Sequence, residues 1–338
     1  MWYKVRFKTG TQRPDSHLSS LNGQKRSTGH MQPYYELAYA LASSSLCFFV
    51  GTGFSKHVTG GAAPGWLSLL KDCCDELSQG KSLIEDLFPD DKAIMPLEEC
   101  ASVIDLQMQK EGKSLYQAIA KKLEKIAASP KRVGKISAFA IKHPSLKFIT
   151  TNYDLLIEKD VLKGNYTGFC PGFPVNRQRS SNEVYHVHGA IKAPDKMVVT
   201  ANDYYRFINH PNYYSKRLDT LIEENTTVII GYSLGDINFK SILNARRLSG
   251  SHEVNRQHLF YLSKKSVPQH VKDYYDSSYG LRVIENTEIE ELVEGIDSKY
   301  DSIAEDVKAA RKQLLRVLSE KKSIRTTTLK NGSRLPRY

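Results

Sequence analysis

The sequence predicts an α/β protein with a Rossmann-like, doubly wound, mostly parallel sheet and a helical insertion. Short apolar runs of strand length recur along the 338 residues, and helical patterns separate several of them. This alternation is typical of parallel strands joined by helices that cover both faces of a sheet. The apolar run at residues 46–50 breaks into Gly51-Thr52-Gly53, as in a buried strand followed by a turn whose free N–H groups meet a phosphate.

The elements on either side of this first strand follow from apolar spacing. Residues 34–42 have helical spacing and precede the strand, and residues 66–77 repeat apolar positions at helical spacing just after Pro64. Because Pro is favoured in the first turn of a helix, a helix is predicted to begin near Trp66. The segment 56–63 contains two glycines and is predicted to be a loop, either a mobile cover for a ligand or a plain exposed connection.

The middle of the chain is predicted to be helical, and strands return after it. Residues 95–145 indicate three helices without a strand, so we expect a helical insertion at about residues 80–145. Further helical patterns lie at residues 213–224, 237–247 and 268–275. The later strands are predicted at residues 146–150, 183–188, 197–200, 227–230, 258–262 and 281–284.

Positive charge is concentrated at the two ends of the chain. Residues 1–30 carry six Lys or Arg and one Asp, and residues 306–338 carry ten Lys or Arg and two acids, so the ends account for the formal net charge of +11. Basic tails can contact nucleic acid or an acidic partner, but a solvated tail is the commoner case and is favoured here.

These patterns divide the chain into three parts. A flexible basic leader is expected at residues 1–32, a folded domain at 33–298, and a C-terminal helix with a basic tail at 299–338. Amphipathic helices are predicted over residues 288–318, and an unstructured end over 326–338.

Composition excludes several classes of protein. Hydrophobic residues make up 40% and charged residues 25% of the chain, which is ordinary for a globular domain. No run approaches the roughly 18 apolar residues of a membrane span, and no signal peptide follows the N-terminus, so we expect a cytoplasmic protein with no membrane partner. The five cysteines form no Cys-x-x-Cys pair, which disfavours a zinc ribbon and a disulfide framework.

Polar residues follow the second predicted strand directly. Asn152 and Asp154 come after the run at 146–150, so their side chains are expected at the same sheet edge as the glycine turn. Asp154 can equally cap a helix that begins at Leu155.

Two further strand ends carry polar residues. His186 and His188 are predicted to share one strand face by alternation, but no third ligand with fitting spacing accompanies them, so a metal site is disfavoured. The strand at 227–230 ends in a glycine turn where Ser233 can meet a phosphate or a ribose, while Asp236 can also cap the next helix.

Together these motifs resemble the sirtuin-like NAD-consuming fold over about residues 34–290. The resemblance rests on four short motifs in the family's order. Gly51-Thr52-Gly53-Phe54-Ser55 with Pro64 resembles the sirtuin Gly-Ala-Gly-x-Ser loop and its proline, Thr151-Asn152-Tyr153-Asp154 its Gln-Asn-x-Asp, His188-Gly189 its His-Gly, and Gly231-Tyr232-Ser233 its Gly-Thr-Ser.

The chain departs from sirtuin deacylases at two places. Those enzymes carry two Cys-x-x-Cys pairs for a structural zinc between the His-Gly and Gly-Thr-Ser motifs, and no cysteine stands there in this sequence. The family's Asp-Phe-Arg after the proline is replaced, with Gly65-Trp66 following Pro64. The variant looks like the zinc-less sirtuin-like domains of bacterial anti-phage systems, so no zinc is expected.

The resemblance implies an NAD glycohydrolase that releases nicotinamide and ADP-ribose, acts in anti-phage defence and is activated by a partner or by assembly. It implies NAD as the substrate, and a homo-oligomer or a complex with a cognate defence protein. Asn152 would bond the ribose or water, and His188 would be the general base. A protein deacylase, an ADP-ribosyltransferase and a non-catalytic sensor of an NAD-derived nucleotide are the alternatives. The resemblance places NAD binding on Gly51, Thr52, Gly53, Ser55, Pro64, Trp66, Asp154, Gly231, Ser233 and Asp236.

Overall fold

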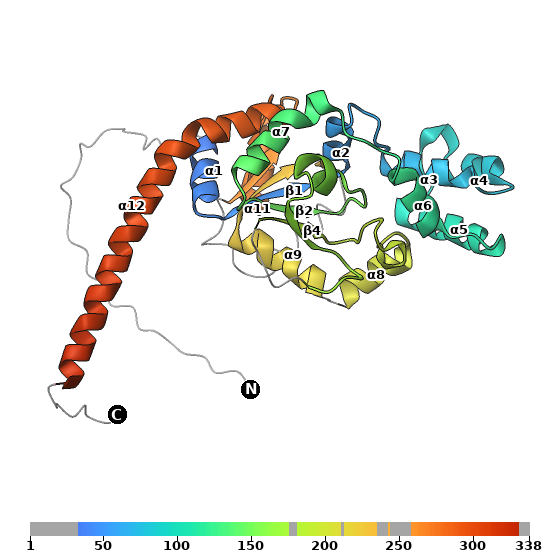
Figure 1. Ribbon diagram of the computed structural model, residues 1–338. Helices are drawn as coiled ribbons and strands as arrows, with labels where there is room; N and C mark the ends of the chain where they lie inside the picture. Colours follow the sequence, from blue (N-terminus) through green and yellow to red (C-terminus); the bar gives the residue numbers. More distant parts are fainter. Residues whose placement is uncertain (1–32, 176–180, 211–212, 235–242, 244–257, 331–338) are drawn as a thin grey trace, which may run out of the picture. The chain divides into compact units, whose positions relative to one another are not determined.

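The structure is a computed structural model that describes residues 33–175, 181–210, 213–234, 243 and 258–330, and only the backbone of residues 320–330. Its centre is a seven-stranded sheet in the order β3-β4-β2-β1-β5-β6-β7, and every pairing in it is parallel (Figure 1). The predicted doubly wound α/β fold is therefore confirmed. The strands are β1 Leu46–Val50, β2 Lys147–Thr150, β3 Tyr166–Phe169, β4 Asn182–His186, β5 Thr226–Ile230, β6 Leu259–Leu262 and β7 Leu281–Ile284.

The central strand β1 shows why its sequence is apolar throughout. Phe48 faces one side of the sheet and Phe49 the other, and all five residues of β1 are buried. In register, Phe49 lies between Ile149 of β2 and Ile229 of β5. A parallel strand covered by helices on both faces needs apolar side chains in both directions.

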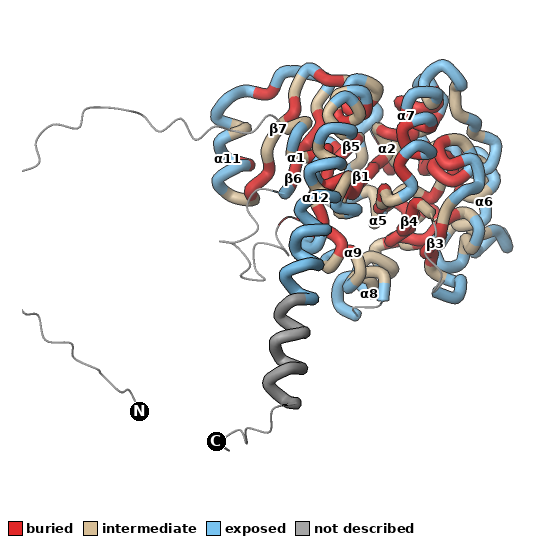
Figure 2. The backbone as a smooth tube through the Cα atoms, turned by 60° about the vertical axis from the view of Figure 1, so that its left-hand side comes forward, coloured by how far each residue is buried: buried red, intermediate tan, exposed pale blue. Residues whose placement is uncertain are grey.

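Each face of the sheet has its own helices. The Phe48 face packs against α1 (Pro33–Ala42), α7 (Pro130–Lys142) and the start of α12 (Ile289–Lys330). The Phe49 face packs against α9 (Tyr213–Glu224) and α11 (Gln269–Tyr279). Figure 2 shows the strands as the most buried part of the chain.

A second hydrophobic core lies among helices that follow the glycine turn. It is formed by side chains of α3, α4, α5 and α6, together with Tyr153, Met197 and Val199. Three helices stand within residues 95–145 as predicted, but the last of them, α7, packs on the sheet rather than in this second core. The elements between β1 and α7 are α2 Thr52–Val58, α3 Trp66–Cys74, α4 Gly80–Leu87, the short helix η1 Pro89–Asp91, α5 Leu97–Lys110 and α6 Leu115–Leu123.

Two predictions about local structure in the first two thirds of the chain are wrong. The segment 197–200 is not a strand, because Thr200 caps α8 (Ala201–Asn209) in a capping box with Asp203. The predicted loop at 56–63 is helical as far as Val58, since α2 continues through it. Sequence reasoning also missed β3, a four-residue edge strand that contains Gly168.

The C-terminal end is more helical than predicted. A single helix, α12, spans Ile289–Lys330, so the expected unstructured end does not begin at Thr326, and the predicted boundary at residue 298 falls inside this helix. The helix predicted at 237–247 lies outside the described residues apart from Leu243. Within the part of the chain that the structure describes, no helix is long and apolar enough to cross a membrane.

Candidate functional site

A cavity of about 530 Å³ opens at the carboxyl ends of the central strands. Strand order reverses at β1, whose neighbours β2 and β5 lead to opposite halves of the sheet, and such a switch point is where open α/β sheets bind ligands. Ten predicted site residues line this cavity: Thr52, Gly53, Ser55, Pro64, Trp66, Asn152, Asp154, His188, Gly231 and Ser233. Gly51 lies behind it, and Asp236 is outside the described residues.

The two glycines after β1 serve backbone packing. The Gly51 N–H donates to the Ile230 carbonyl (2.9 Å) and the Gly53 N–H to the Gly231 carbonyl (2.8 Å). A Cβ on Gly53 would stand 2.7 Å from the Gly231 backbone, and Gly231 itself has φ +78°. Glycine is needed because two loops touch here, and these two N–H groups are not free for a phosphate as the sequence had suggested.

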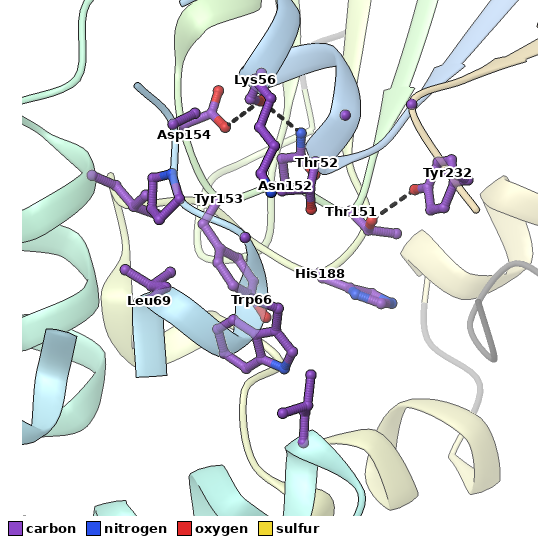
Figure 3. A pocket seen from close by; sticks show the side chains of 18 of the residues that line it. Thr52, Lys56, Trp66, Leu69, Thr151, Asn152, Tyr153, Asp154, His188 and Tyr232 are labelled. Atoms are coloured by element: carbon purple, nitrogen blue, oxygen red, sulfur yellow. Dashed lines mark hydrogen bonds between the residues drawn. The ribbon is translucent and has the colours of Figure 1, made fainter. Parts of the chain in front are cut away.

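A relay of three side chains fixes the orientation of Asn152. The Ser55 hydroxyl donates to the Asp154 carboxylate (2.7 Å), so the Ser55 oxygen must accept the bond from the Asn152 amide nitrogen (2.8 Å). A hydroxyl has one proton to give, and this decides which end of the Asn152 amide faces Ser55. The amide oxygen of Asn152 is thereby left for the cavity (Figure 3).

Asp154 lines the cavity and also caps the helical turn after β2. One carboxylate oxygen accepts from Ser55 and the other from the Leu156 N–H (3.2 Å), at the start of the helical turn after β2. Burial raises the pKa of Asp154, although both hydrogen bonds and the nearby His186 lower it. The carboxylate lies in the wall of the cavity, where its negative charge can stabilise a cationic ligand group.

His186 lies beneath Asn152 and outside the cavity lining. One ring nitrogen, Nδ1, is 3.0 Å from the Asn152 carbonyl oxygen, and the other, Nε2, is 2.7 Å from Oε1 of Glu158. Burial opposes protonation of the ring, but the charge and hydrogen bonds of its partners prevail and raise the pKa of His186. Glu158 comes from the π-helix η2 (Ile157–Val161).

His188 has quite different surroundings. Its ring lies edge-on to Tyr204 (centroids 5.3 Å apart) and Phe207 (4.9 Å), both on α8. Burial alone lowers the pKa of His188 to about 4, so the ring is neutral at physiological pH and can accept a proton from a group in the cavity. The predicted alternation does not apply, because β4 ends at His186 and the two rings contact different residues.

The outer wall of the cavity comes from the second core. Trp66 packs edge-on against Tyr153 (5.8 Å), and Leu69, Leu97 and Leu123 add aliphatic surface. Sequence reasoning identified Trp66 but missed the three leucines, because leucines at helical spacing show only that a helix buries one face. It also missed Tyr204, because only the fold brings α8 to the end of β4.

Lys56 is another lining residue that the motifs do not mark. It is exposed on α2 and is the single Lys or Arg among the described lining residues. Within the described part of the chain, the ion pairs found include none to Lys56. The acids in the same lining are Asp154 and Glu98. The place of Lys56 directly after Ser55 of the glycine motif is the feature of the sequence that could have indicated a role at this site.

One group of metal-ligating side chains occurs among the described residues, away from the cavity lining. His57, Glu288 and Glu290 bring possible ligand atoms within 4.8 Å of one another. Lys264 already supplies positive charge there, since its ammonium group lies 2.7 Å from Nδ1 of His57 and 2.8 Å from Glu288. An ammonium group only donates, so His57 carries its proton on Nε2, toward Glu290.

Comparison with known proteins agrees with the sirtuin-like fold. Residues 146–284 match the family model described as SIR2-like domain. The chain is 25% identical over 256 residues to "Defense-associated sirtuin 2" of Bacillus subtilis, a match that covers 74% of this chain and 24% of that protein.

Two further relatives are named "NAD(+) hydrolase ThsA". The protein of Bacillus cereus (strain MSX-D12) is 28% identical over 128 residues, covering 36% of this chain and 26% of that protein. The protein of Cytobacillus dafuensis is 24% identical over 233 residues, covering 67% of this chain and 43% of that protein. These matches thus cover between 24% and 43% of the length of the curated relatives. The resemblance drawn from four short motifs is confirmed: residues 146–284 match a SIR2-like domain, and the chain is similar to a defence-associated sirtuin and to two proteins named as NAD(+) hydrolases.

Proposed function

We propose that the chain is an NAD glycohydrolase that cleaves the bond between nicotinamide and ribose with water as the acceptor. One observation carries this proposal: the oriented amide oxygen of Asn152 and the neutral ring of His188 line the same cavity as the Asp154 carboxylate. The names of the two ThsA relatives support it. A role in anti-phage defence belongs to the same proposal, supported by the name of the Bacillus subtilis relative.

Cleavage of the bond between nicotinamide and ribose mainly requires that the protein position the water and stabilise the positive charge on the ribose. Nicotinamide leaves as a neutral molecule when the glycosidic bond breaks and its electron pair returns to the ring nitrogen. Positive charge then develops on the ribose, and the Asp154 carboxylate in the cavity wall is the anion that can stabilise it. Water forms the new bond to the anomeric carbon, and its proton passes to His188.

Asn152 and Lys56 have separate tasks in this proposal. The Asn152 amide oxygen accepts a hydrogen bond from the attacking water or from a ribose hydroxyl, in an orientation that Ser55 and Asp154 maintain. Lys56 neutralises the pyrophosphate, since the N–H groups of Gly51 and Gly53 are already bonded to carbonyls. Pro64, Trp66, Ser233 and Asp236, which lies outside the described residues, keep the binding roles that the resemblance implies, whereas Gly51 contributes only backbone packing.

The direct test is to incubate the purified chain with NAD and to follow nicotinamide and ADP-ribose. The proposal predicts equal amounts of both products without any protein acceptor. Release that depends on an added acetylated or nucleophilic protein would identify a deacylase or an ADP-ribosyltransferase instead. Tight binding of NAD without cleavage, under every condition of assembly tried, would identify a sensor.

We also propose that activity depends on self-association through the exposed part of α12. Its first turns are buried against α1 and α7, but the apolar residues Leu314, Leu315, Val317 and Leu318 are between 44% and 59% exposed (Figure 2). The same face that packs within the chain thus continues outward as apolar surface, which a second copy can cover. Deleting residues 306–338 should lower the oligomeric mass by light scattering and reduce NAD cleavage. A full-length protein that is monomeric and fully active would contradict this dependence.

A further inference from the structure

His186 and Glu158 form a deeply buried polar pair beneath Asn152, and the proposed mechanism has so far given this pair no function. The exposed fractions of His186 and Glu158 are 2% and 4%. Nδ1 of His186 lies 3.0 Å from the Asn152 carbonyl oxygen, and Nε2 lies 2.7 Å from Oε1 of Glu158. Neither residue lines the cavity, so neither can touch a ligand there.

The two partners of His186 decide its protonation. A backbone carbonyl can only accept a hydrogen bond, and an ionised carboxylate can only accept one. Both ring nitrogens must therefore carry a proton, which makes the ring an imidazolium. The pKa of Glu158 is lowered despite its burial, because of the charge and the hydrogen bond of His186, and this agrees with an ion pair rather than a neutral pair.

We propose that the buried Glu158–His186 ion pair is a positioning device for Asn152. The inference rests on the proposed NAD hydrolysis. Asn152 is held at three points: its N–H donates to the Thr150 hydroxyl (3.0 Å), its carbonyl accepts from His186, and its amide donates to Ser55. The first two bonds fix the backbone, and without the second the residue can rotate its amide oxygen out of the cavity.

Stability of the fold does not account for this pair. Burying two charges costs solvation, and buried ion pairs can often be replaced by apolar residues without loss of stability. Oε2 of Glu158 is buried without a hydrogen-bond partner among the described residues, which adds to the cost. The Glu158 backbone lies in a π-helix, a rare form that occurs often at functional sites. A costly arrangement that contacts the backbone of a proposed catalytic residue indicates a function in catalysis.

The charges around the pair determine its response to pH. Asp154 on one side of His186 favours the imidazolium, while Lys192 near Glu158 favours the carboxylate and Cys170 lies close to the same carboxylate. Since the folded-state pKa of His186 is raised, the imidazolium is present below that pKa and is lost as pH rises through it. The turnover number should therefore fall on the alkaline side.

The test is Glu158→Gln, compared with Asp297→Asn as a matched control. Asp297 forms a similar pair with buried His143 (2.8 Å), between α7 and α12 and away from the cavity lining. We expect Glu158→Gln to lower kcat about tenfold, to leave KM nearly unchanged, and to move the alkaline fall of kcat to lower pH. Asp297→Asn should leave kcat and its pH profile unchanged.

A second measurement does not depend on activity or on the folding of a variant. The ¹⁵N shifts of the His186 ring in the wild-type protein should report an imidazolium at pH 7, whether or not NAD is cleaved. A neutral His186 ring would overturn the proposal, as would a Glu158→Gln variant with wild-type kcat or with an unmoved pH profile. A wild-type protein with a charged His186 and no NAD cleavage would instead refute the proposed function and, with it, the positioning role.

Discussion

His186 and His188 stand two residues apart at the end of β4, and both are buried, yet their surroundings drive them to opposite charge states. His186 has an acid and a carbonyl at hydrogen-bond distance, and its pKa is raised. His188 has two aromatic rings, and its pKa is lowered to about 4. Burial disfavours charge in both rings, so the partner decides. The end of β4 thus supplies both a cation beneath Asn152, which is His186, and a proton acceptor in the cavity, which is His188.

The largest effects should come from removing the groups that face the cavity. Asn152→Ala and His188→Ala should each lower nicotinamide release by at least about a hundredfold, because each removes a group proposed to act on the reacting atoms. His186→Ala should cost less, since that ring acts through Asn152. Circular dichroism should show that all three variants are folded. If His188→Ala kept near wild-type turnover while His186→Ala lost it, the division of roles between the two histidines would be reversed.

Breaking the relay above His186 should have a smaller effect. Ser55→Ala removes the acceptor of the Asn152 amide and the donor to Asp154, so Asn152 stays in place but is free to turn. We expect kcat to fall roughly tenfold, the usual size of an effect on an orienting group, with little change in KM. Ser68→Ala is a suitable control, because the Ser68 hydroxyl bonds only the nearby Gly65 carbonyl on an exposed helix start. Equal loss in both variants would remove the case for the relay.

The sequence predicts features that depend on neighbouring residues, but not contacts between residues that are far apart in the chain. The glycine turn, most of the strands and the helical layer followed from local pattern, and the parallel, doubly wound sheet followed from the alternation of elements. The reason for Gly51 and Gly53 did not, because their carbonyl partners lie near residue 230, about 180 positions away. Glu158 stands among polar neighbours in Ile157-Glu158-Lys159-Asp160 and looks exposed on a regular helix.

The cage around His188 was equally hidden. Tyr204 and Phe207 belong to α8, in a segment where a strand was predicted just before the helix begins. Only the fold brings this helix against the end of β4, so no local signal could have shown that His188 is neutral. The motif resemblance implies that His188 is the base, and the structure shows the burial that keeps its ring neutral.

The two histidines should also affect the dependence of stability on pH in opposite ways. For His188 the folded pKa is about 4 against an ordinary value of 6.5, so its contribution to stability is complete above pH 6.5 and is lost as pH falls toward 4. At 1.4 kcal/mol per pKa unit this amounts to roughly 3 kcal/mol. Urea unfolding at pH 7 and pH 4.5 should therefore show a smaller acid loss for His188→Gln than for the wild type. An identical loss in both proteins would show that His188 is not the buried neutral ring described here.

The smallest expected effect concerns the exposed edge of the cavity. Lys56→Gln should raise KM for NAD by a few fold and leave kcat unchanged, because an exposed cation attracts a pyrophosphate only modestly. The wild-type KM should rise with salt, and that of Lys56→Gln should rise less. Lys56→Arg should behave like the wild type. If Lys56→Gln had the same KM as the wild type, groups other than Lys56 would bind the pyrophosphate.

The most direct test of the central claim, that water is the acceptor at this cavity, is cleavage of NAD in H₂¹⁸O with mass analysis of the product. Water attack at the anomeric carbon predicts one ¹⁸O in the ADP-ribose formed, one nicotinamide for each ADP-ribose, and at least about a hundredfold less of both products from the Asn152→Ala variant. ADP-ribose found attached to protein, or nicotinamide released without labelled ADP-ribose, would contradict the claim.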